Sequence, residues 1–282
     1  MYYVDPNADS ITVLGTMPSD GPSGWNSTDV MYAPGKILRC GGGSTALPEQ
    51  HGPQSQGKNA AAVIDISVAT PSYKKMASMP KYLIWANATV LADGDVVVTG
   101  GSAADNALTG MNTDALLWKS GTGGWTQGAQ STAGIARLYH SVALLLPDGS
   151  VLSGGGGAPG PQTNLNVEIY YPPYLFTNSG TFAPRPTITP GVGPDIITYG
   201  QSFAVGVDSA AGIQRVTFIK TASVTHSFNF EQRFMDLKFT PNVDRLSVQA
   251  PSSAAMATPG NYLLFVIDRL GVPSVAKILR IG

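Results

Sequence analysis

The feature that most constrains this chain is a threefold repeat in which a tight turn between two apolar runs is followed by a cluster of glycines. Each copy is typical of a strand, a turn, a second strand and a glycine pair. The copies lie 59 (94 − 35) and 55 (149 − 94) residues apart when measured between the turn glycines, Gly35, Gly94 and Gly149. A period near ~50 residues with paired glycines indicates a kelch-type propeller blade.

A further apolar segment follows each glycine cluster, at residues 61–66, 114–118 and 167–171. These segments supply the outer strands of a four-stranded blade. We therefore predict that residues 1–183 form a partial kelch-type β-propeller, with three blades and, from residues 1–16, the outer strands of part of a fourth. Closed propellers have about four to eight blades, so we expect an open ring with an exposed strand edge.

The pattern changes at a proline-rich stretch, residues 184–190, which we take as a domain boundary near residue 183. Short apolar segments with partial alternation follow over about 100 residues, at spacings typical of a β-sandwich. The sequence therefore predicts an immunoglobulin-like β-sandwich at residues 184–282. The chain holds 33 glycines and 21 prolines without a collagen period, which favours an all-β fold with many turns.

Charge and hydropathy exclude several classes of partner. The chain has 17 basic and 18 acidic residues, a net formal charge of −1, so we predict no binding to nucleic acid or to an anionic membrane. No apolar run approaches the roughly 18 residues needed to span a bilayer. The first residues do not form a signal peptide, so either the protein stays inside the cell or the chain begins partway through a longer one. The single cysteine, Cys40, forms no internal disulfide.

Two of the three histidines stand in candidate metal-binding contexts. His140 follows Tyr139, and His226 lies in the second predicted domain. A phenolate oxygen and two imidazole nitrogens form a donor set that suits copper. Neighbouring side chains of a regular strand point to opposite faces, so Tyr139 and His140 can share an ion only from an irregular segment before the strand. The residues alone leave two alternatives to metal binding open. His140 can be a histidine at the propeller rim with ordinary hydrogen bonds, and His226 can be a loop histidine without a role.

Aromatic residues occupy the same repeat position in the other blades. Trp85 stands nine residues before Gly94, as His140 does before Gly149, and Trp25 stands ten before Gly35. We predict that Trp25, Trp85 and Tyr139 pack around the propeller channel. The alternative for Trp85 is a wall of a substrate site.

These segments resemble the galactose oxidase and glyoxal oxidase family of copper radical oxidases. The likeness covers most of residues 130–282 in the same order, and the earlier blades fit more loosely. It is carried by Arg137-Leu-Tyr139-His140-Ser141, by the glycines at 154–157, by residues 168–175 and 185–186, by Thr225-His226 to Arg233, and by residues 259–276.

The resemblance implies a kelch propeller followed by an early-set immunoglobulin-like domain, which brings a histidine loop to one copper ion at the propeller axis. It implies that Tyr139 is the axial tyrosine, a copper ligand and the general base, with its pKa lowered from about 10 by the metal. His140 and His226 correspond to the imidazole ligands. The implied reaction oxidises a small primary alcohol or aldehyde, which includes carbohydrates, with O₂ to give H₂O₂. A full-length parent is expected outside the cell.

The sequence departs from the family at the radical cofactor, a tyrosine bonded to a cysteine. Nothing before residue 139 matches that block, and Cys40 is expected to be a buried core residue. The chain is then either the C-terminal part of a longer oxidase or a homologue without the chemistry. The alternative function is a non-catalytic propeller and sandwich that binds carbohydrate or a protein partner through Trp25, Trp85 and the glycine-rich loops.

Overall fold

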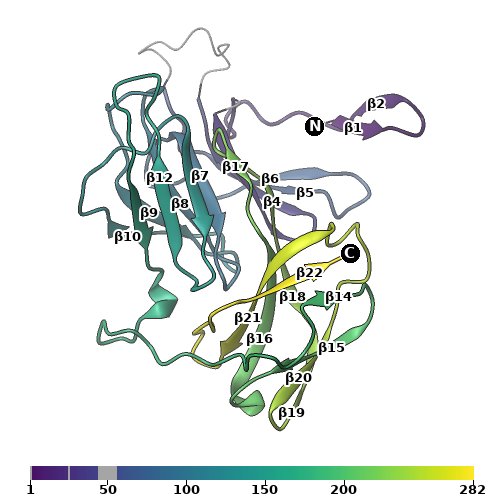
Figure 1. The fold of residues 1–282 in the computed structure, drawn as a ribbon. Helices are drawn as coiled ribbons and strands as arrows, with labels where there is room; N and C mark the ends of the chain where they lie inside the picture. Colours follow the sequence, from purple (N-terminus) through teal and green to yellow (C-terminus); the bar gives the residue numbers. More distant parts are fainter. Residues whose placement is uncertain (1, 25, 44–55) are drawn as a thin grey trace.

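The computed structural model describes residues 2–24, 26–43 and 56–282. In this part of the chain the regular structure is β-strand, apart from two short 3₁₀ turns, η2 (Pro173–Leu175) and η3 (Ala210–Gly212). Blade-like sheets occupy the upper part of the molecule and a sandwich the lower part (Figure 1). The predicted all-β architecture, a partial propeller followed by an immunoglobulin-like sandwich, is confirmed. No helix in the described ranges is long and apolar enough to cross a membrane.

Within each of the three repeats the strands pair antiparallel. Each repeat contributes consecutive strands, paired in chain order. The first contains β3 (Ser27–Ala33), β4 (Lys36–Gly41), β5 (Ala61–Asp65) and β6 (Ser72–Lys75); the second contains β7 (Ile84–Val90), β8 (Val96–Ser102), β9 (Asp114–Trp118) and β10 (Trp125–Gln130); the third contains β11 (Ser141–Leu145), β12 (Val151–Gly155) and β13 (Val167–Tyr170). The third sheet therefore ends at β13, where apolar residues such as Val167 are exposed.

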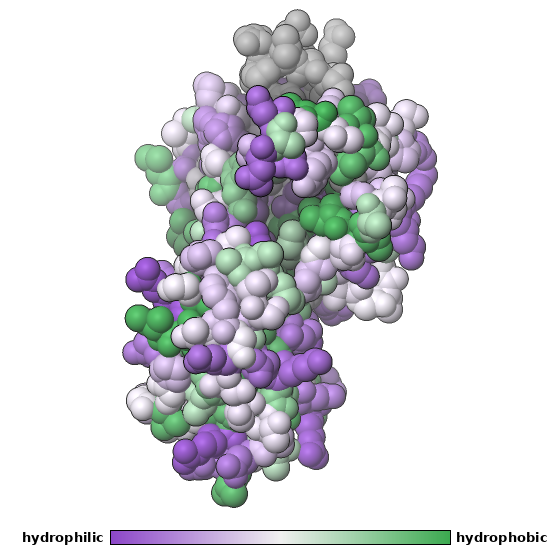
Figure 2. Space-filling view, turned by 90° about the vertical axis from the view of Figure 1, so that its right-hand side faces the viewer, coloured by the Kyte–Doolittle hydropathy of each residue, from purple (hydrophilic) through white to green (hydrophobic). Residues whose placement is uncertain are grey.

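Residues near the N-terminus form a separate two-stranded hairpin, β1 (Tyr2–Asp5) and β2 (Ser10–Val13). The hairpin projects away from the other sheets (Figure 1). Its large apolar side chains are exposed, and Figure 2 shows hydrophobic residues at the surface of the upper part on the face it displays. That these strands belong to a fourth blade stays a prediction.

The glycine pairs of the repeat hold the segment that leads into the next blade. Gly42 donates its N–H to the carbonyl of Leu83 at 2.8 Å, and Gly101 donates to the carbonyl of Arg137 at 2.7 Å. Both glycines have positive φ, +82° in each case, a conformation that costs other residues energy. In the third repeat Gly157 donates to the carbonyl of Tyr139 at 2.7 Å. The repeated glycines thus position the segments before β7 and β11.

The second half of the chain contains the strands of the sandwich. One sheet has three strands in the order β15-β20-β19, and the other has the order β14-β22-β21-β16-β18. The bounds are β14 (Ile196–Ile197), β15 (Ser202–Gly206), β16 (Ile213–Lys220), β17 (Val224–Thr225), β18 (Phe228–Leu237), β19 (Phe239–Asn242), β20 (Arg245–Gln249), β21 (Gly260–Asp268) and β22 (Lys277–Ile281). The short apolar segments predicted for this domain, residues 202–207, 215–219, 246–248 and 262–267, fall on β15, β16, β20 and β21.

Strand β18 joins the sandwich to the first blade, because it pairs in parallel with β3. The larger sheet of the sandwich therefore continues through β18 into β3, β4, β5 and β6. The boundary near residue 183 stays a prediction.

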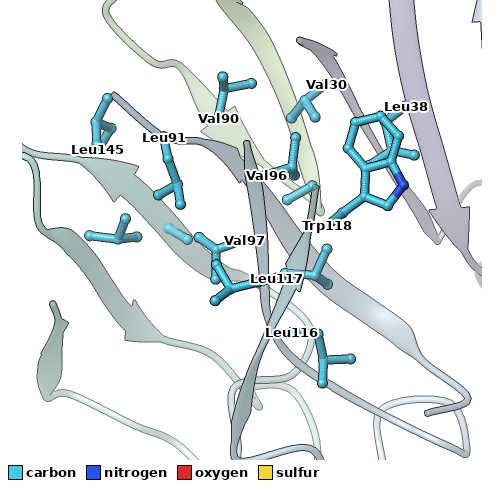
Figure 3. Packing of buried hydrophobic residues seen from close by; sticks show 14 of the residues in the cluster. Val30, Leu38, Val90, Leu91, Val96, Val97, Leu116, Leu117, Trp118 and Leu145 are labelled. Atoms are coloured by element: carbon cyan, nitrogen blue, oxygen red, sulfur yellow. The ribbon is translucent and has the colours of Figure 1, made fainter. Parts of the chain in front are cut away.

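Strand β21, in the larger sheet of the sandwich, is buried on both faces. Leu264 and Val266 of β21 belong to the core between the two sandwich sheets, whereas Leu263 and Phe265 belong to the core of the blades. This alternation follows the period of two along a strand. Figure 3 shows part of the blade core, where side chains of the first, second and third blades meet, among them Val30, Leu38, Val97, Leu117 and Leu145.

A half-buried carboxylate lies where the second blade meets the sandwich. Asp93 lies in the turn between β7 and β8, where its carbonyl accepts a hydrogen bond from Arg215 Nη1 at 2.8 Å. Its carboxylate accepts the backbone N–H of Asp95 at 3.1 Å. Burial, and secondarily the charge of Asp95, raise the pKa of Asp93 to about 6, against the opposing effect of Lys119 and Arg215.

Asp93→Asn is expected to raise the free energy of unfolding at pH 7.5 by on the order of 2 kcal/mol, with little change at pH 4. The folded pKa is higher than the unfolded value, so protonation of Asp93 stabilises the fold. That contribution is complete below about pH 4 and is lost as the pH rises through about 6. Asparagine keeps the acceptor for Asp95 without the charge. Urea titrations of both proteins at the two pH values measure the difference, and a difference independent of pH would contradict this assignment.

Candidate metal centre

Tyr139 and His140 lie in the turn that leads into the innermost strand of the third blade. Strand β11 begins at Ser141, so neither residue belongs to a regular strand. His140 has a φ of +64°, which reverses the usual direction of its side chain relative to Tyr139. The two rings lie on the same side, with centroids 3.8 Å apart. The prediction of an irregular segment before the strand is confirmed.

His226 lies at the tip of a hairpin that reaches from the sandwich to the blades. It occupies the two-residue turn between β17 and β18, where His226 and Ser227 both have positive φ, +53° and +67°. Turns of this kind normally contain Asn and Gly. Strand β17 lies in the upper part of the molecule (Figure 1) and contacts β11. The sandwich thus carries an imidazole to the third blade.

The structure brings the three candidate residues together. His140 Nε2 and His226 Nε2 are 3.0 Å apart. The Tyr139 ring lies 5.3 Å from the His226 ring between centroids, at 67°. His140 is exposed, and Tyr139 and His226 are half-buried, so the cluster opens to solvent.

The outer nitrogen of each imidazole has its own partner. His140 Nδ1 donates to the carbonyl oxygen of Ala158 at 3.0 Å, because a carbonyl can only accept. His226 Nδ1 pairs with the hydroxyl of Thr225 at 2.7 Å. When Nδ1 carries the proton, Nε2 of a neutral imidazole presents a lone pair. Two lone pairs facing each other at this separation repel unless a proton or a cation lies between them.

This arrangement fits a metal ion. Two imidazole nitrogens about 2 Å from one ion and 3.0 Å from each other subtend an angle close to a right angle at that ion. Neighbouring ligands of a tetragonal Cu(II) site stand at that angle. Among the described residues no group of three His, Cys, Asp or Glu side chains is placed to hold a metal. The candidate for a third protein donor is the phenol of Tyr139, whose ring lies beside both imidazoles. One phenol and two imidazoles suit copper.

Burial and the neighbouring imidazole of His140 lower the pKa of His226. Its neutral form, the form that binds a metal, is therefore favoured near neutral pH.

Strained backbone concentrates at this cluster. Trp85, His140 and His226 all have positive φ, and for Trp85 it is +61°. Such conformations cost non-glycine residues about 1–3 kcal/mol each and are found most often at functional sites. Trp85 interrupts the pairing of β7 with β8, which passes from Ile84 to Ala86. It stands at the repeat position of His140 in the preceding blade, so the two blades share a left-handed backbone conformation at this position.

Trp85 packs against the ring of Tyr139. Its buried indole contacts the Tyr139 ring edge to face, with centroids 4.6 Å apart. Its Nε1–H donates to Asp105 Oδ1 at 2.5 Å. The predicted packing role of Trp85 is therefore the one that the structure shows, and full burial removes it as an exposed platform for a partner. The prediction for Trp25 lies outside the described residues.

Asp105 and Asn106 contribute to the site although the sequence did not indicate them. Both follow β8, and Asn106 Oδ1 accepts the backbone N–H of Tyr139 at 3.3 Å. Their position in the repeat is the signal that could have found them, because they follow the second glycine pair closely. The segment that follows the glycines of the third repeat contains Ala158, whose carbonyl oxygen bonds His140.

The side-chain amide of Gln232 fastens the histidine hairpin to the second blade. Gln232 Oε1 accepts the backbone N–H of Val90 at 2.8 Å, and Nε2 donates to the carbonyl of the same residue at 3.4 Å. Asn229 Nδ2 donates to the same Oε1 at 3.1 Å. The buried amide thus makes the two hydrogen bonds to the backbone of Val90 that a residue of a neighbouring strand would make.

Gln232→Leu is expected to lower the free energy of unfolding by about 2 kcal/mol, because the buried N–H of Val90 loses its partner. It is also expected to weaken metal binding, since the strand that follows His226 loses its attachment to β7. Urea titration and Cu(II) titration measure the two effects. Gln214→Leu, at an exposed position of β16, is the matched control. Equal effects of the two substitutions would contradict the role of Gln232.

Cys40 lies away from solvent in the core of the blades, together with Val30 and Leu38. Burial raises the pKa of its thiol, which keeps it protonated and unreactive. The expectation of a buried core cysteine is confirmed.

Comparison with known proteins relates both halves of the chain to one group. Residues 185–281 match the family described as "Galactose oxidase-like, Early set domain". A galactose oxidase of Gibberella zeae is 35% identical over 198 residues, which cover 68% of this chain and 28% of that protein. The aldehyde oxidase GLOX of Vitis pseudoreticulata is 28% identical over 285 residues, covering 94% of this chain and 53% of that protein.

A solved structure has the same fold. It is a fungal alcohol oxidase of the AA5 family in complex with copper, with a TM-score of 0.82 and 28% sequence identity, and the match covers 91% of this chain and 54% of that one. The chain therefore spans between 28% and 54% of the length of these three proteins.

Proposed function

The chain is a homologue of galactose oxidase and glyoxal oxidase, with a galactose oxidase-like early-set domain at residues 185–281, and on this premise we propose that it provides the copper site of an oxidase that acts on primary alcohols or aldehydes. The observation that supports this most directly is the 3.0 Å separation of His140 Nε2 and His226 Nε2 beside the Tyr139 ring. The similar structure in complex with copper supports the choice of metal.

In this proposal the chain's own residues hold the ion and move one proton. His140 and His226 bind through Nε2, while Ala158 and Thr225 fix the orientation of the rings through Nδ1. Tyr139 binds through its phenolate oxygen, which accepts the hydroxyl proton of the substrate as general base. Trp85 holds the Tyr139 ring in place. When bound, copper lowers the pKa of the phenol and accepts one electron.

The second electron needs another acceptor. Cys40 is the single cysteine of the chain and is enclosed in the blade core, so we do not assign it to a tyrosine–cysteine cofactor. Oxidation of an alcohol to an aldehyde removes two electrons and two protons, which reduce O₂ to H₂O₂. The proposal therefore assigns to this chain the metal ligands and the base, but not the radical.

The substrate class follows from the relatives and from the open site. The exposure of His140 allows a small alcohol or aldehyde to reach the cluster. A carbohydrate with a primary hydroxyl group belongs to this class and is proposed as one candidate. The extracellular location of a full-length parent belongs to the same proposal.

The proposal is tested with purified chain loaded with Cu(II). We expect one copper per chain by elemental analysis, and an electron paramagnetic resonance spectrum of a tetragonal site with nitrogen ligands. Peroxide formation is then measured with galactose, glycerol and glycolaldehyde in a peroxidase-coupled assay, with any in-frame upstream region included in the expressed protein. Absence of bound copper, or a spectrum without nitrogen coupling, would contradict the metal assignment. When the expressed protein includes an upstream region that supplies the radical cofactor, absence of peroxide from all three compounds would contradict the oxidase assignment.

A further inference from the structure

A cavity of about 480 Å³ lies between the second and third blades. Residues of β9 and β10 line one side of it, and residues of β12 and β13 line the other. Tyr139, His140 and His226 are not among the lining residues, so the cavity is separate from the metal cluster. Its volume is within the range of about 300–1,000 Å³ that is typical of small-molecule sites.

The walls carry charged groups that are already paired within the protein. On the second blade Asp114 pairs with Lys81, and it accepts a hydrogen bond from Gln127 Nε2 at 2.9 Å. On the third blade Arg137 Nη2 donates to Glu168 Oε2 at 3.0 Å. Asp114 and Arg137 are buried, with 4% and 3% of their surfaces exposed. A charged ligand would find no unpaired counter-charge among these groups.

The same walls contain polar atoms that lack a partner. Asp114 Oδ1, Arg137 Nε, the Thr99 hydroxyl and the Tyr170 hydroxyl are buried, and none of them has a hydrogen-bond partner in the described part of the chain. These four atoms are enclosed by protein atoms. The polar groups that an occupant of the cavity can reach are exposed ones of its lining, among them the amide of Gln130 and the hydroxyl of Thr132, which together donate and accept hydrogen bonds.

An aromatic wall completes the cavity. Tyr171 and Phe176 line it together with Tyr170. Phe182 stacks on Phe176 with centroids 4.8 Å apart and contacts Tyr171 edge to face, so the aromatic side chains support each other. Tyr171 exposes 42% of its surface. Such rings offer a flat apolar face beside a polar rim.

From this combination we infer that the cavity between the second and third blades binds a neutral polyhydroxylated molecule, such as a monosaccharide. Its hydroxyl groups both donate and accept hydrogen bonds, as the mixed walls require, and its C–H face packs on the aromatic residues. A carboxylic acid or an amine meets only paired charges, and an apolar molecule leaves the exposed amide of Gln130 and hydroxyl of Thr132 without partners. The site is independent of the metal cluster.

The test uses saturation-transfer NMR on the full chain in the presence of EDTA, with D-galactose as the probe. D-gluconate and cyclohexanol serve as the charged and apolar comparisons. We expect saturation transfer to the ring protons of galactose, and weaker or no transfer to the other two compounds. His226→Ala is expected to leave this binding unchanged, which separates the cavity from the proposed copper site. Galactose binding that disappears in His226→Ala would overturn the inference.

Two substitutions locate the binding. Ala129→Trp, at an exposed lining position of β10, places a large ring in the cavity and is expected to weaken galactose binding at least about tenfold. Thr126→Trp, exposed on the same strand and outside the lining, is the matched control. Tyr171→Ala removes an exposed ring without filling the cavity and is expected to weaken binding about fivefold. No transfer to galactose, equal binding in Ala129→Trp and Thr126→Trp, or tighter binding of gluconate or cyclohexanol would overturn the inference.

Discussion

Replacing His226 with alanine is expected to lower the affinity of the chain for Cu(II) at least about 100-fold, because one of two imidazole donors is removed. His226 is the only ligand candidate that the sandwich contributes, so the substitution leaves Tyr139 and His140 on the blade without their partner at 3.0 Å. The measurement is a competitive titration against a chelator of known copper affinity, followed by the nitrogen coupling in the electron paramagnetic resonance spectrum.

Phe230→Ala is the control for the histidine substitution. Phe230 lies four residues further along the same segment and exposes 65% of its surface, so its removal is expected to change neither copper affinity nor stability. The metal-free His226→Ala protein is expected to unfold at the same urea concentration as the unmodified chain or a higher one, since the turn at φ +53° is strained. Unchanged copper affinity in His226→Ala would refute the metal centre as we describe it.

Gly100→Ala is expected to lower the free energy of unfolding by about 3 kcal/mol. Gly100 has a φ of +68°, and a Cβ atom at this position would lie 2.5 Å from the carbonyl oxygen of Arg137 and 2.7 Å from the Arg137 Cβ. These contacts are too close to be tolerated, so the segment from Arg137 to Tyr139 must move. We therefore expect a loss of copper affinity as well as of stability, although residue 100 touches neither histidine.

Gly134→Ala separates the two causes of that loss. Gly134 has a φ of +62°, close to that of Gly100, but no atom lies within 4 Å of the position of an added Cβ. This variant therefore measures the conformational cost alone, which we expect to be about 1 kcal/mol. Urea titrations of both variants give the comparison. If they were equally destabilised, the close approach of Arg137 to Gly100 would carry no energetic weight.

The sequence predicted the sheets because both signals involved are local. Turn glycines lie between the apolar runs that form β3–β4, β7–β8 and β11–β12. The glycine pairs that follow adopt the positive φ that only glycine adopts without cost. The requirement that Tyr139 and His140 precede a strand followed from the alternation of side chains. The position of Trp85 at the equivalent point of the preceding blade followed from counting back to the turn glycine.

The meeting of His226 with this pair did not follow from local signals. It depends on a parallel pairing of β18 with β3 and on hydrogen bonds between Gln232 and Val90, which lie 142 positions apart in the chain. A single side-chain amide that bonds to a strand in place of a neighbouring strand produces no periodic pattern in the sequence. The left-handed backbone of His226 was equally hidden, because the turn contains His-Ser in place of the usual Asn-Gly.

Because strands β16, β18 and β21 contribute side chains to both cores, neither half of the molecule can be removed without uncovering the other. Ile219, Phe234, Leu263 and Phe265 point from sandwich strands into the blade core, and an isolated C-terminal half would present all four to water. We therefore expect residues 184–282 produced alone to aggregate or to bind hydrophobic dyes, and the intact chain to melt in one cooperative transition in calorimetry. In that case this domain could not have been exchanged in evolution as an independent module without new side chains at the interface between the sandwich and the blades.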